Sequence, residues 1–182
     1  YSLLTNKLLA TFHWLLQKVN FSYIFKCDDD SFARIDIIAA ELEHRSQLKP
    51  LYWGFFQGYA RVKKTGRWAE NKWVLCDRYL PHARGGGYVL SSSLLTFIVN
   101  NMHMLQKFNS EDISVGTWLA PLDIERLHDP RFDTEHISRG CSNEYIVTHK
   151  QTVVDMYGKY KNIMETGQIC GQNGSFQVRL SY

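Results

Sequence analysis

The chain has 182 residues, of which 45% are hydrophobic and 21% charged, with a formal net charge of +3. We expect a single domain with a substantial core, spanning residues 1–182. The small net charge, with no evenly spaced basic stripe, excludes a typical nucleic-acid-binding protein. We find neither an apolar stretch long enough to span a bilayer nor a signal peptide. Because the chain opens in mid-helix, we expect a fragment of a longer protein.

The first part of the chain alternates between helical and extended patterns. An amphipathic helix is predicted at the start from apolar residues at helical spacing, namely Leu4, Leu8, Phe12, Leu15 and Val19. Apolar and polar residues then alternate over 21–25, which predicts a strand, and helical spacing returns over 35–42. Two further strands are predicted at 51–56 and 59–63, with a turn at 64–67.

Three consecutive carboxylates, Asp28, Asp29 and Asp30, stand at the carboxyl end of the first predicted strand. In open α/β sheets, ligands bind at this end of the strands. Capping of the following helix by Asp30 or Ser31 would explain one acid, or two at most. Adjacent carboxylates repel one another, so a third is better explained by a bound divalent cation with oxygen ligands. We therefore favour a metal site.

Three glycines, Gly85, Gly86 and Gly87, precede a short predicted strand at Tyr88–Leu90, and a helix is expected through 94–99. Glycines permit positive φ angles and let a ligand approach the backbone closely. The spacing is not that of a dinucleotide-binding fingerprint, because the glycines precede a strand and not a helix. A structural turn and a ligand-binding segment both remain open at this point.

Ser110 is predicted to cap a helix whose first turn contains Glu111 and Asp112. Acids are stabilised at a helix N-terminus, so this placement requires no function. Alternatively, one of the two is a general base that takes a proton from a substrate hydroxyl. The residues alone do not choose between Glu111 and Asp112.

The last part of the chain is predicted to contain a turn at 129–132, a short strand at 145–148 and a helix through 153–164. His149 follows the end of that strand, as the acids follow theirs. Imidazole is a common metal ligand, but a lone histidine is more often structural. On position alone we do not assign His149 to the metal site.

The cysteines do not have the close paired spacing of zinc sites, and they number four: Cys27, Cys76, Cys141 and Cys170. One or two disulfides are compatible with this number, and so are four free, buried cysteines. Glycosylation sequons at Asn20 and Asn173, together with disulfides, would suit a secretory compartment.

The chain resembles glycosyltransferase family 31, the β-1,3-glycosyltransferases of the Golgi, in four segments that occur in the family's order: F-S-Y-I-F-K-C-D-D-D-S-F, G-G-G-Y-V-L-S, S-E-D-I-S-V-G and V-T-H-K. Intervening segments such as L-Y-W-G-F-F and H-D-P-R-F-D-T-E are most similar to members that act on the proteoglycan linkage region. The resemblance implies an α/β, GT-A-like nucleotide-sugar-binding fold, with helices flanking a mixed, mostly parallel central sheet. It also implies a luminal catalytic domain anchored in the Golgi membrane, although the upstream nucleotide-binding strands, stem and anchor of a type II membrane protein have no counterpart in this sequence.

The resemblance assigns roles residue by residue. Asp30 and His149 match positions that hold Mn²⁺ in this family. Asp28 and Asp29 match acids that lie near the nucleotide and sugar of the donor, and Gly85–Gly87 match a segment that passes close to it.

The reaction implied by the resemblance is an inverting transfer of galactose from UDP-galactose to the 3-hydroxyl of galactosyl-β-1,4-xylose on proteoglycan core proteins. Asp112 matches the proposed catalytic base, and Glu111 would be a supporting residue. Trp53 and Trp118 are candidates to stack on acceptor sugars, although core positions fit them equally well. The alternatives are transfer of N-acetylglucosamine, a metal-dependent hydrolase or phosphatase, and a catalytically inactive glycan-binding homologue.

Overall fold

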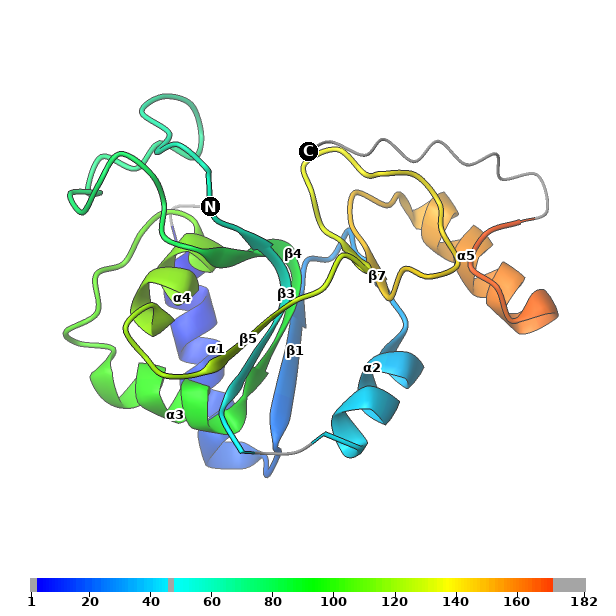
Figure 1. Cartoon of the computed structure of the whole chain (residues 1–182), viewed down its shortest axis with the longest axis horizontal. Coiled ribbons are helices and arrows are strands. Elements are labelled where there is room, and N and C mark those ends of the chain that lie inside the picture. Colours follow the sequence, from blue (N-terminus) through cyan, green and yellow to red (C-terminus); the bar gives the residue numbers. More distant parts are fainter. Residues whose placement is uncertain (1–2, 46–47, 172–182) are drawn as a thin grey trace.

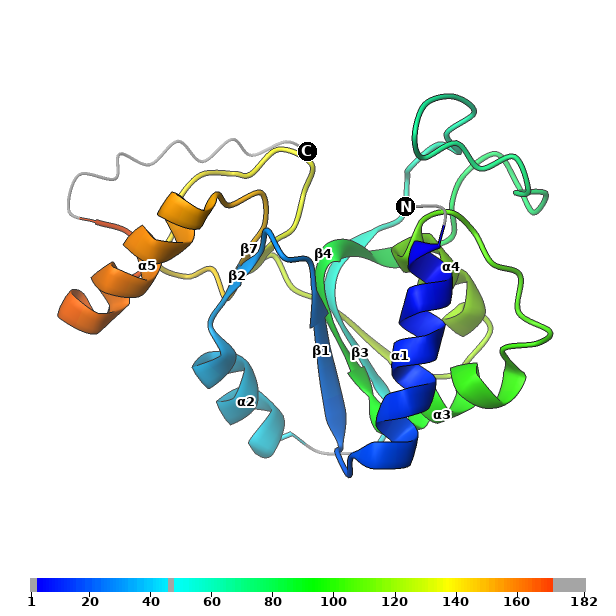
Figure 2. The ribbon, with the colours of Figure 1, turned by 180° about the vertical axis from the view of Figure 1, so that it is seen from behind.

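The structure, a computed structural model, describes residues 3–45 and 48–171 (Figure 1). Its centre is a four-stranded sheet in the order β1 (Tyr23–Cys27), β4 (His82–Ser91), β3 (Leu51–Gln57) and β5 (Glu125–His128). Three helices cover one face: α1 (Leu4–Lys18), α3 (Ser92–Asn101) and α4 (Glu111–Leu119). Seen from behind in Figure 2, the other side carries α2 (Ile35–Glu43), α5 (Val153–Thr166) and a small sheet in the order β2 (Phe32–Ala33), β7 (Val147–Thr148) and β6 (Phe132–Asp133).

The sheet divides the core because successive side chains of a strand point to opposite faces. Tyr52 of β3 and Leu90 of β4 pack against α1, α3 and α4. Their neighbours Trp53 and Val89 face the other way, into a cluster that includes Ile38 of α2. Both faces of β3 and of the end of β4 are therefore buried, which explains the apolar runs at 51–56 and 88–90.

The sheet is mixed, as predicted, but the expectation that it is mostly parallel is wrong. β4 lies between β1 and β3 and is antiparallel to both, and only β3 and β5 pair in parallel within this sheet. After Gln57 the chain returns at the same end of the sheet, where Gln57 is opposite His82. A parallel neighbour would have needed a crossover to the opposite end.

Most predicted elements are present, with boundaries shifted by a few residues, and the turn at Asp129 is confirmed by a hydrogen bond from the Phe132 amide. The strand predicted at 59–63 is wrong, because only Arg61 forms a bridge there, with Arg78. Segment 58–81 is instead a long excursion, and its buried apolar side chains form a small cluster with two residues from elsewhere in the chain: Val62, Trp73 and Tyr79 pack with Phe108 and Ile113.

One disulfide links Cys141, before β7, to Cys170, after α5. Cys27 and Cys76 are free and exposed. The prediction of one or two disulfides is therefore confirmed with a single disulfide, and the alternative of four free, buried cysteines is wrong.

Asn20 lies exposed in the connection between α1 and β1, where a glycan would meet no obstruction from the core. The second sequon asparagine, Asn173, lies outside the described residues. Over residues 3–45 and 48–171, none of the helices combines the length and apolar character needed to cross a membrane.

Gly116 lies where α4 packs on the start of β4. A Cβ at this position would overlap the Cβ of His82 and lie 2.9 Å from both His82 Cα and the Pro81 carbonyl oxygen. Because backbone atoms cannot rotate away, we expect Gly116→Ala to lower the free energy of unfolding by about 1–3 kcal/mol. Urea unfolding measures this change.

The matched control is Gly158→Ala in α5, where an added Cβ would meet nothing within 4 Å. Alanine is the better helix former, so this substitution should stabilise the protein by up to about 1 kcal/mol. Equal effects at the two positions would contradict the packing described for α4.

Candidate active site

The predicted acids and the predicted histidine come together because β2 pairs with β7. Asp28 follows β1 directly, and Asp30 ends the turn that leads into β2. Phe32 of β2 lies opposite Thr148 of β7, so the residue after Thr148 is placed beside the acids. The Gln151 amide also donates to the Asp30 carbonyl over 2.9 Å, which fixes the two segments together.

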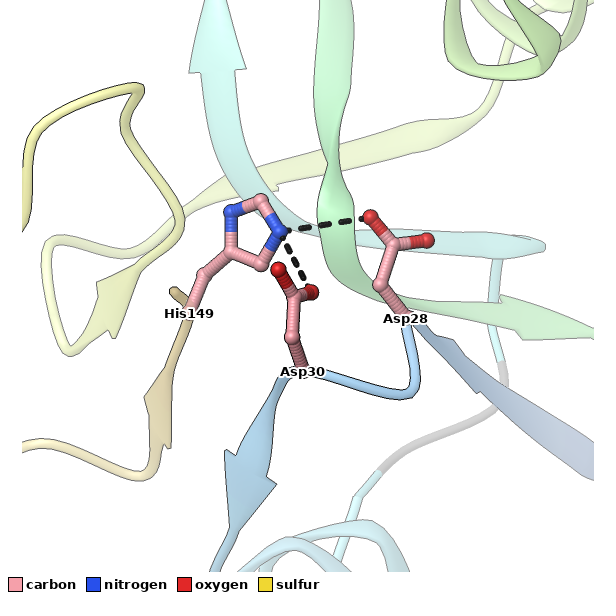
Figure 3. A group of neighbouring side chains, drawn as sticks. All are labelled: Asp28, Asp30 and His149. Atoms are coloured by element: carbon pink, nitrogen blue, oxygen red, sulfur yellow. Dashed lines mark ion pairs between the residues drawn. The ribbon is translucent and has the colours of Figure 1, made fainter. Parts of the chain in front are cut away.

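The side chains of Asp28, Asp30 and His149 point toward one another (Figure 3). His149 Nε2 lies 2.9 Å from Asp30 Oδ1 and 3.3 Å from Asp28 Oδ2, and the three groups offer atoms within 4.8 Å of one another. Neither buried ring nitrogen of His149 has a hydrogen-bond partner among the described residues. Two carboxylates around such a nitrogen fit a divalent cation that accepts oxygen and imidazole ligands, as Mn²⁺ does.

Asp28 is well suited to bind a cation because it is held in its ionised form. Burial alone would raise its pKa, but the nearby His149 ring and the charge of Lys26 outweigh burial and lower the pKa of Asp28 to about 2. Asp29, in contrast, is exposed and does not join the cluster. The structure thus places Asp28 beside the predicted pair of metal ligands, Asp30 and His149, as a third candidate.

The interpretation that Asp30 or Ser31 caps the next helix is wrong. Helix α2 begins later, at Ile35, with Arg34 at its N-cap position. Ser31 Oγ instead donates to the Gly86 carbonyl over 2.6 Å. The turn residues therefore serve the site and not the helix.

The three glycines lie inside strand β4, and not in a turn before it as one interpretation had it. None of them has a positive φ angle. An added Cβ on Gly86 would lie 2.8 Å from Cγ of His149, and one on Gly85 would lie 3.2 Å from Oε1 of Glu111. Glycine fits here because the side chains of His149 and Glu111 lie directly against the strand, most closely at Gly86.

The edge of β4 beside these glycines is hydrogen-bonded by side chains. Strand β1 ends at Cys27, opposite Gly87, so it supplies no backbone partner beyond that point. Lys26 Nζ donates to the Gly85 carbonyl over 2.6 Å, and the Gly85 amide donates to Asp112 Oδ2 over 3.0 Å. The end of β1 thereby creates a place where polar side chains from several elements converge.

Glu111 and Asp112 occupy the first turn of α4 as predicted, with Ser110 at the N-cap position but without a side-chain cap. Asp112 is half-buried, and its two oxygens accept hydrogen bonds from the amides of Gly85 and Ile113. Glu111 is only 4% exposed and pairs with Lys26 over 2.5 Å. Burial and the Asp112 carboxylate raise the pKa of Glu111, against the opposing charge of Lys26. Of the two, Asp112 has the carboxylate that a substrate can reach.

Sequence reasoning missed Lys26. It stands in an alternating strand, where a polar residue is expected to face solvent, yet its side chain is only 14% exposed because both faces of the sheet are covered. Its position two residues before Asp28 was the only available signal in the sequence.

The structure places both candidate stacking tryptophans in the core. Trp53 is 1% exposed, donates to Asp129 Oδ2 over 3.0 Å and packs edge-on against Phe132. Trp118 is 4% exposed and donates to the Gln106 carbonyl over 2.7 Å. Neither ring offers a free face on which an acceptor sugar could stack.

Asp129, which holds Trp53, should make stability depend on pH. Burial raises the pKa of Asp129, but hydrogen bonds from Arg131 and Trp53 outweigh burial and lower it below its ordinary value. An acid with a lowered pKa stabilises the fold above its unfolded pKa, and this contribution is lost as pH falls through its folded pKa. We expect Asp129→Asn to cost about 2 kcal/mol at neutral pH, because charged hydrogen bonds are lost.

Urea unfolding across pH tests this prediction. The difference in free energy of unfolding between the original protein and Asp129→Asn should shrink as pH falls below about 4. The exposed Asp77 provides the control, since Asp77→Asn should show no such trend. A difference that stays constant down to acid pH would contradict an ionised Asp129.

Comparison with known proteins identifies the family. Residues 1–130 match the family described as Galactosyltransferase. A mixed α/β fold with an Asp-Asp-His group at a strand end is consistent with that match. The chain belongs to the galactosyltransferase family, as its sequence motifs predicted.

Curated relatives extend the similarity over the whole chain. Beta-1,3-galactosyltransferase 6 of Mus musculus is 51% identical over 184 residues, covering 100% of this chain and 56% of the mouse protein. Hydroxyproline O-galactosyltransferase GALT2 of Arabidopsis thaliana is 31% identical, and the match covers 93% of this chain and 25% of the Arabidopsis protein. UDP-GalNAc:beta-1,3-N-acetylgalactosaminyltransferase 2 of Xenopus tropicalis is 30% identical, and the match covers 71% of this chain and 26% of the Xenopus protein. The chain thus spans about half of the mouse relative and about a quarter of the others.

Proposed function

We propose that the chain is the catalytic domain, GT-A-like in fold, of a metal-dependent inverting β-1,3-galactosyltransferase. It moves galactose from UDP-galactose to the 3-hydroxyl of galactosyl-β-1,4-xylose on proteoglycan core proteins. The observation that carries this proposal is the convergence of a candidate cation site and a candidate base on neighbouring glycines, Gly86 and Gly85. The identity of 51% with a β-1,3-galactosyltransferase of mouse supports the sugar and the linkage, and the acceptor rests on the resemblance of the sequence motifs.

Asp28, Asp30 and His149 would hold Mn²⁺. A divalent cation there would neutralise the diphosphate of the donor as the nucleotide leaves. Asp29 and the backbone of Gly85–Gly87 are the further residues that we assign to donor binding, on the family motifs that they match.

Asp112 is the proposed base. The amides of Gly85 and Ile113 hold its carboxylate in one orientation while part of it stays exposed. It takes the proton from the acceptor hydroxyl as that oxygen attacks the anomeric carbon from the side opposite the nucleotide. One displacement inverts the configuration, so no nucleophilic serine or cysteine is needed. Glu111 supports Asp112 from within the same helical turn.

We expect the longer protein to be a type II Golgi membrane protein with this domain in the lumen. The Cys141–Cys170 disulfide and the exposed sequon at Asn20 support an oxidising, secretory compartment.

Transfer by the secreted full-length protein tests the donor and the acceptor together. With UDP-galactose, Mn²⁺ and a galactosyl-β-1,4-xyloside, we expect a β-1,3-linked galactose product. UDP-N-acetylglucosamine and UDP-N-acetylgalactosamine, the latter named for a 30% identical relative, should give none. Product from either of these instead would overturn the donor assignment. Binding of UDP without product from any donor would favour an inactive glycan-binding homologue, and release of free galactose without acceptor would favour a hydrolase.

A further inference from the structure

Lys26 lies between the cation site and the first turn of α4. Its Nζ is 2.8 Å from Asp28 Oδ1, 2.5 Å from Glu111 Oε1 and 2.6 Å from the Gly85 carbonyl oxygen. An ammonium group has three N–H donors and no acceptor. Lys26 donates hydrogen bonds to the oxygens of Asp28, in the turn after β1, and of Gly85 in β4, and it forms an ion pair with Glu111 of α4.

The surroundings of Lys26 restrict its movement and so fix its contacts with Asp28, Glu111 and Gly85. Its side chain is 14% exposed and that of Glu111 is 6% exposed, with the Tyr88 ring 5.5 Å from the ammonium group. The ammonium group lies between the carboxylates of Glu111 and Asp28, which balance its positive charge from two sides. Charges attract one another more strongly in such an environment than in water.

We propose that Lys26 is a positioning residue that couples the cation site to the catalytic base. On one side it fixes Asp28. On the other it holds Glu111 and the carbonyl of Gly85, whose amide in turn orients Asp112. This inference rests on the proposed function, because it takes Asp112 as the base and Asp28 as a cation ligand.

The link has a consequence that a purely structural lysine would not have. Lys26 neutralises part of the negative charge of Asp28, so it competes with a cation for that carboxylate. Removal of its charge should therefore strengthen cation binding while it weakens transfer, because Asp112 loses its support. General damage to the fold would weaken both.

The test is Lys26→Met in the full-length protein, with free Mn²⁺ followed by electron paramagnetic resonance and transfer followed by kcat and KM. We expect the Kd for Mn²⁺ to fall about tenfold, as one nearby unit charge is removed. We expect kcat to fall about 100-fold through misplacement of the base, with little change in acceptor KM. Lys26→Arg keeps the charge and should restore part of kcat.

The matched control is Lys49→Met, which removes a lysine–carboxylate pair with Asp123 on the exposed surface. Exposed pairs contribute little, so neither Mn²⁺ affinity nor kcat should change. This control separates the loss of a positive charge in general from its loss between Asp28 and Glu111.

Lys26→Met leaves Glu111 buried without its partner, which destabilises the fold. The double variant Lys26→Met/Glu111→Gln removes both charges and is measured in parallel. If Lys26 acts through Glu111, the double variant loses no more kcat than Lys26→Met alone.

A kcat within about twofold of the original in either variant would overturn the proposal, since misplacement of a base costs far more. Weaker Mn²⁺ binding in both variants would overturn it as well. Lack of transfer by the unmodified protein would contradict the proposed function instead, and the Mn²⁺ titration would still test the competition between Lys26 and a cation for Asp28.

Discussion

Asp112→Asn is expected to abolish galactose transfer while Mn²⁺-dependent binding of UDP is retained. The amide cannot take the proton of the acceptor hydroxyl, so kcat should fall about a thousandfold or more. The donor side should be preserved, because Asp28, Asp30 and His149 form a cluster that does not include Asp112. Transfer assays and calorimetric titration of UDP in the presence of Mn²⁺ measure the two effects separately.

Two companion variants sharpen this result. Asp123→Asn changes an exposed acid that forms an ion pair with Lys49 on the surface, and it should leave both measurements unchanged. Glu111→Gln should lower kcat less than Asp112→Asn if Glu111 only supports the base. Loss of transfer in Glu111→Gln with activity kept in Asp112→Asn would exchange the two roles, and loss of UDP binding in Asp112→Asn would make Asp112 structural.

Gly86→Ala should also lower activity strongly, although it alters no polar group. The new Cβ would lie 2.8 Å from Cγ and 2.9 Å from Nδ1 of His149, so the ring has to move. Changes to the residues that orient a metal ligand lower metal affinity about 10- to 100-fold. We expect Mn²⁺ affinity and the rate of transfer to fall together by this factor. Calorimetric titration with Mn²⁺ measures the first effect.

Gly58→Ala is the matched control, because a Cβ there would meet nothing within 4 Å. It should leave Mn²⁺ affinity unchanged. Normal Mn²⁺ binding by Gly86→Ala would contradict the assignment of His149 as a metal ligand that packs against Gly86.

The sequence predicted the acids of the site better than it predicted their partners. Asp28–Asp30 are adjacent along the chain, and their position after a strand follows from local alternation of apolar residues. His149 is far away in sequence, and it reaches the acids only because β2 pairs with β7, which are strands of two residues each. Elements so short have no periodicity to recognise, so the motif resemblance identified His149 where the pattern could not.

Strand direction and the role of the glycines were likewise beyond local patterns. A run such as Leu51–Gln57 shows that a strand is buried on both faces, which is typical of parallel sheets. Here helices and a second small sheet cover an antiparallel arrangement, which produces the same pattern. The sequence indicated that something lies close to the backbone of Gly85 and Gly86. The structure shows that these are the side chains of Glu111 in α4 and of His149 in the segment after β7.

The anomeric configuration of the new linkage is the measurement that tests the central claim most directly. The secreted full-length protein would be followed by proton NMR during transfer from UDP-galactose, with and without a chelator. A single displacement assisted by Asp112 predicts only β-linked galactose from the α-linked donor, and no product once Mn²⁺ has been removed. An α-linked product, or transfer undiminished by chelation, would contradict a metal-dependent inverting galactosyltransferase.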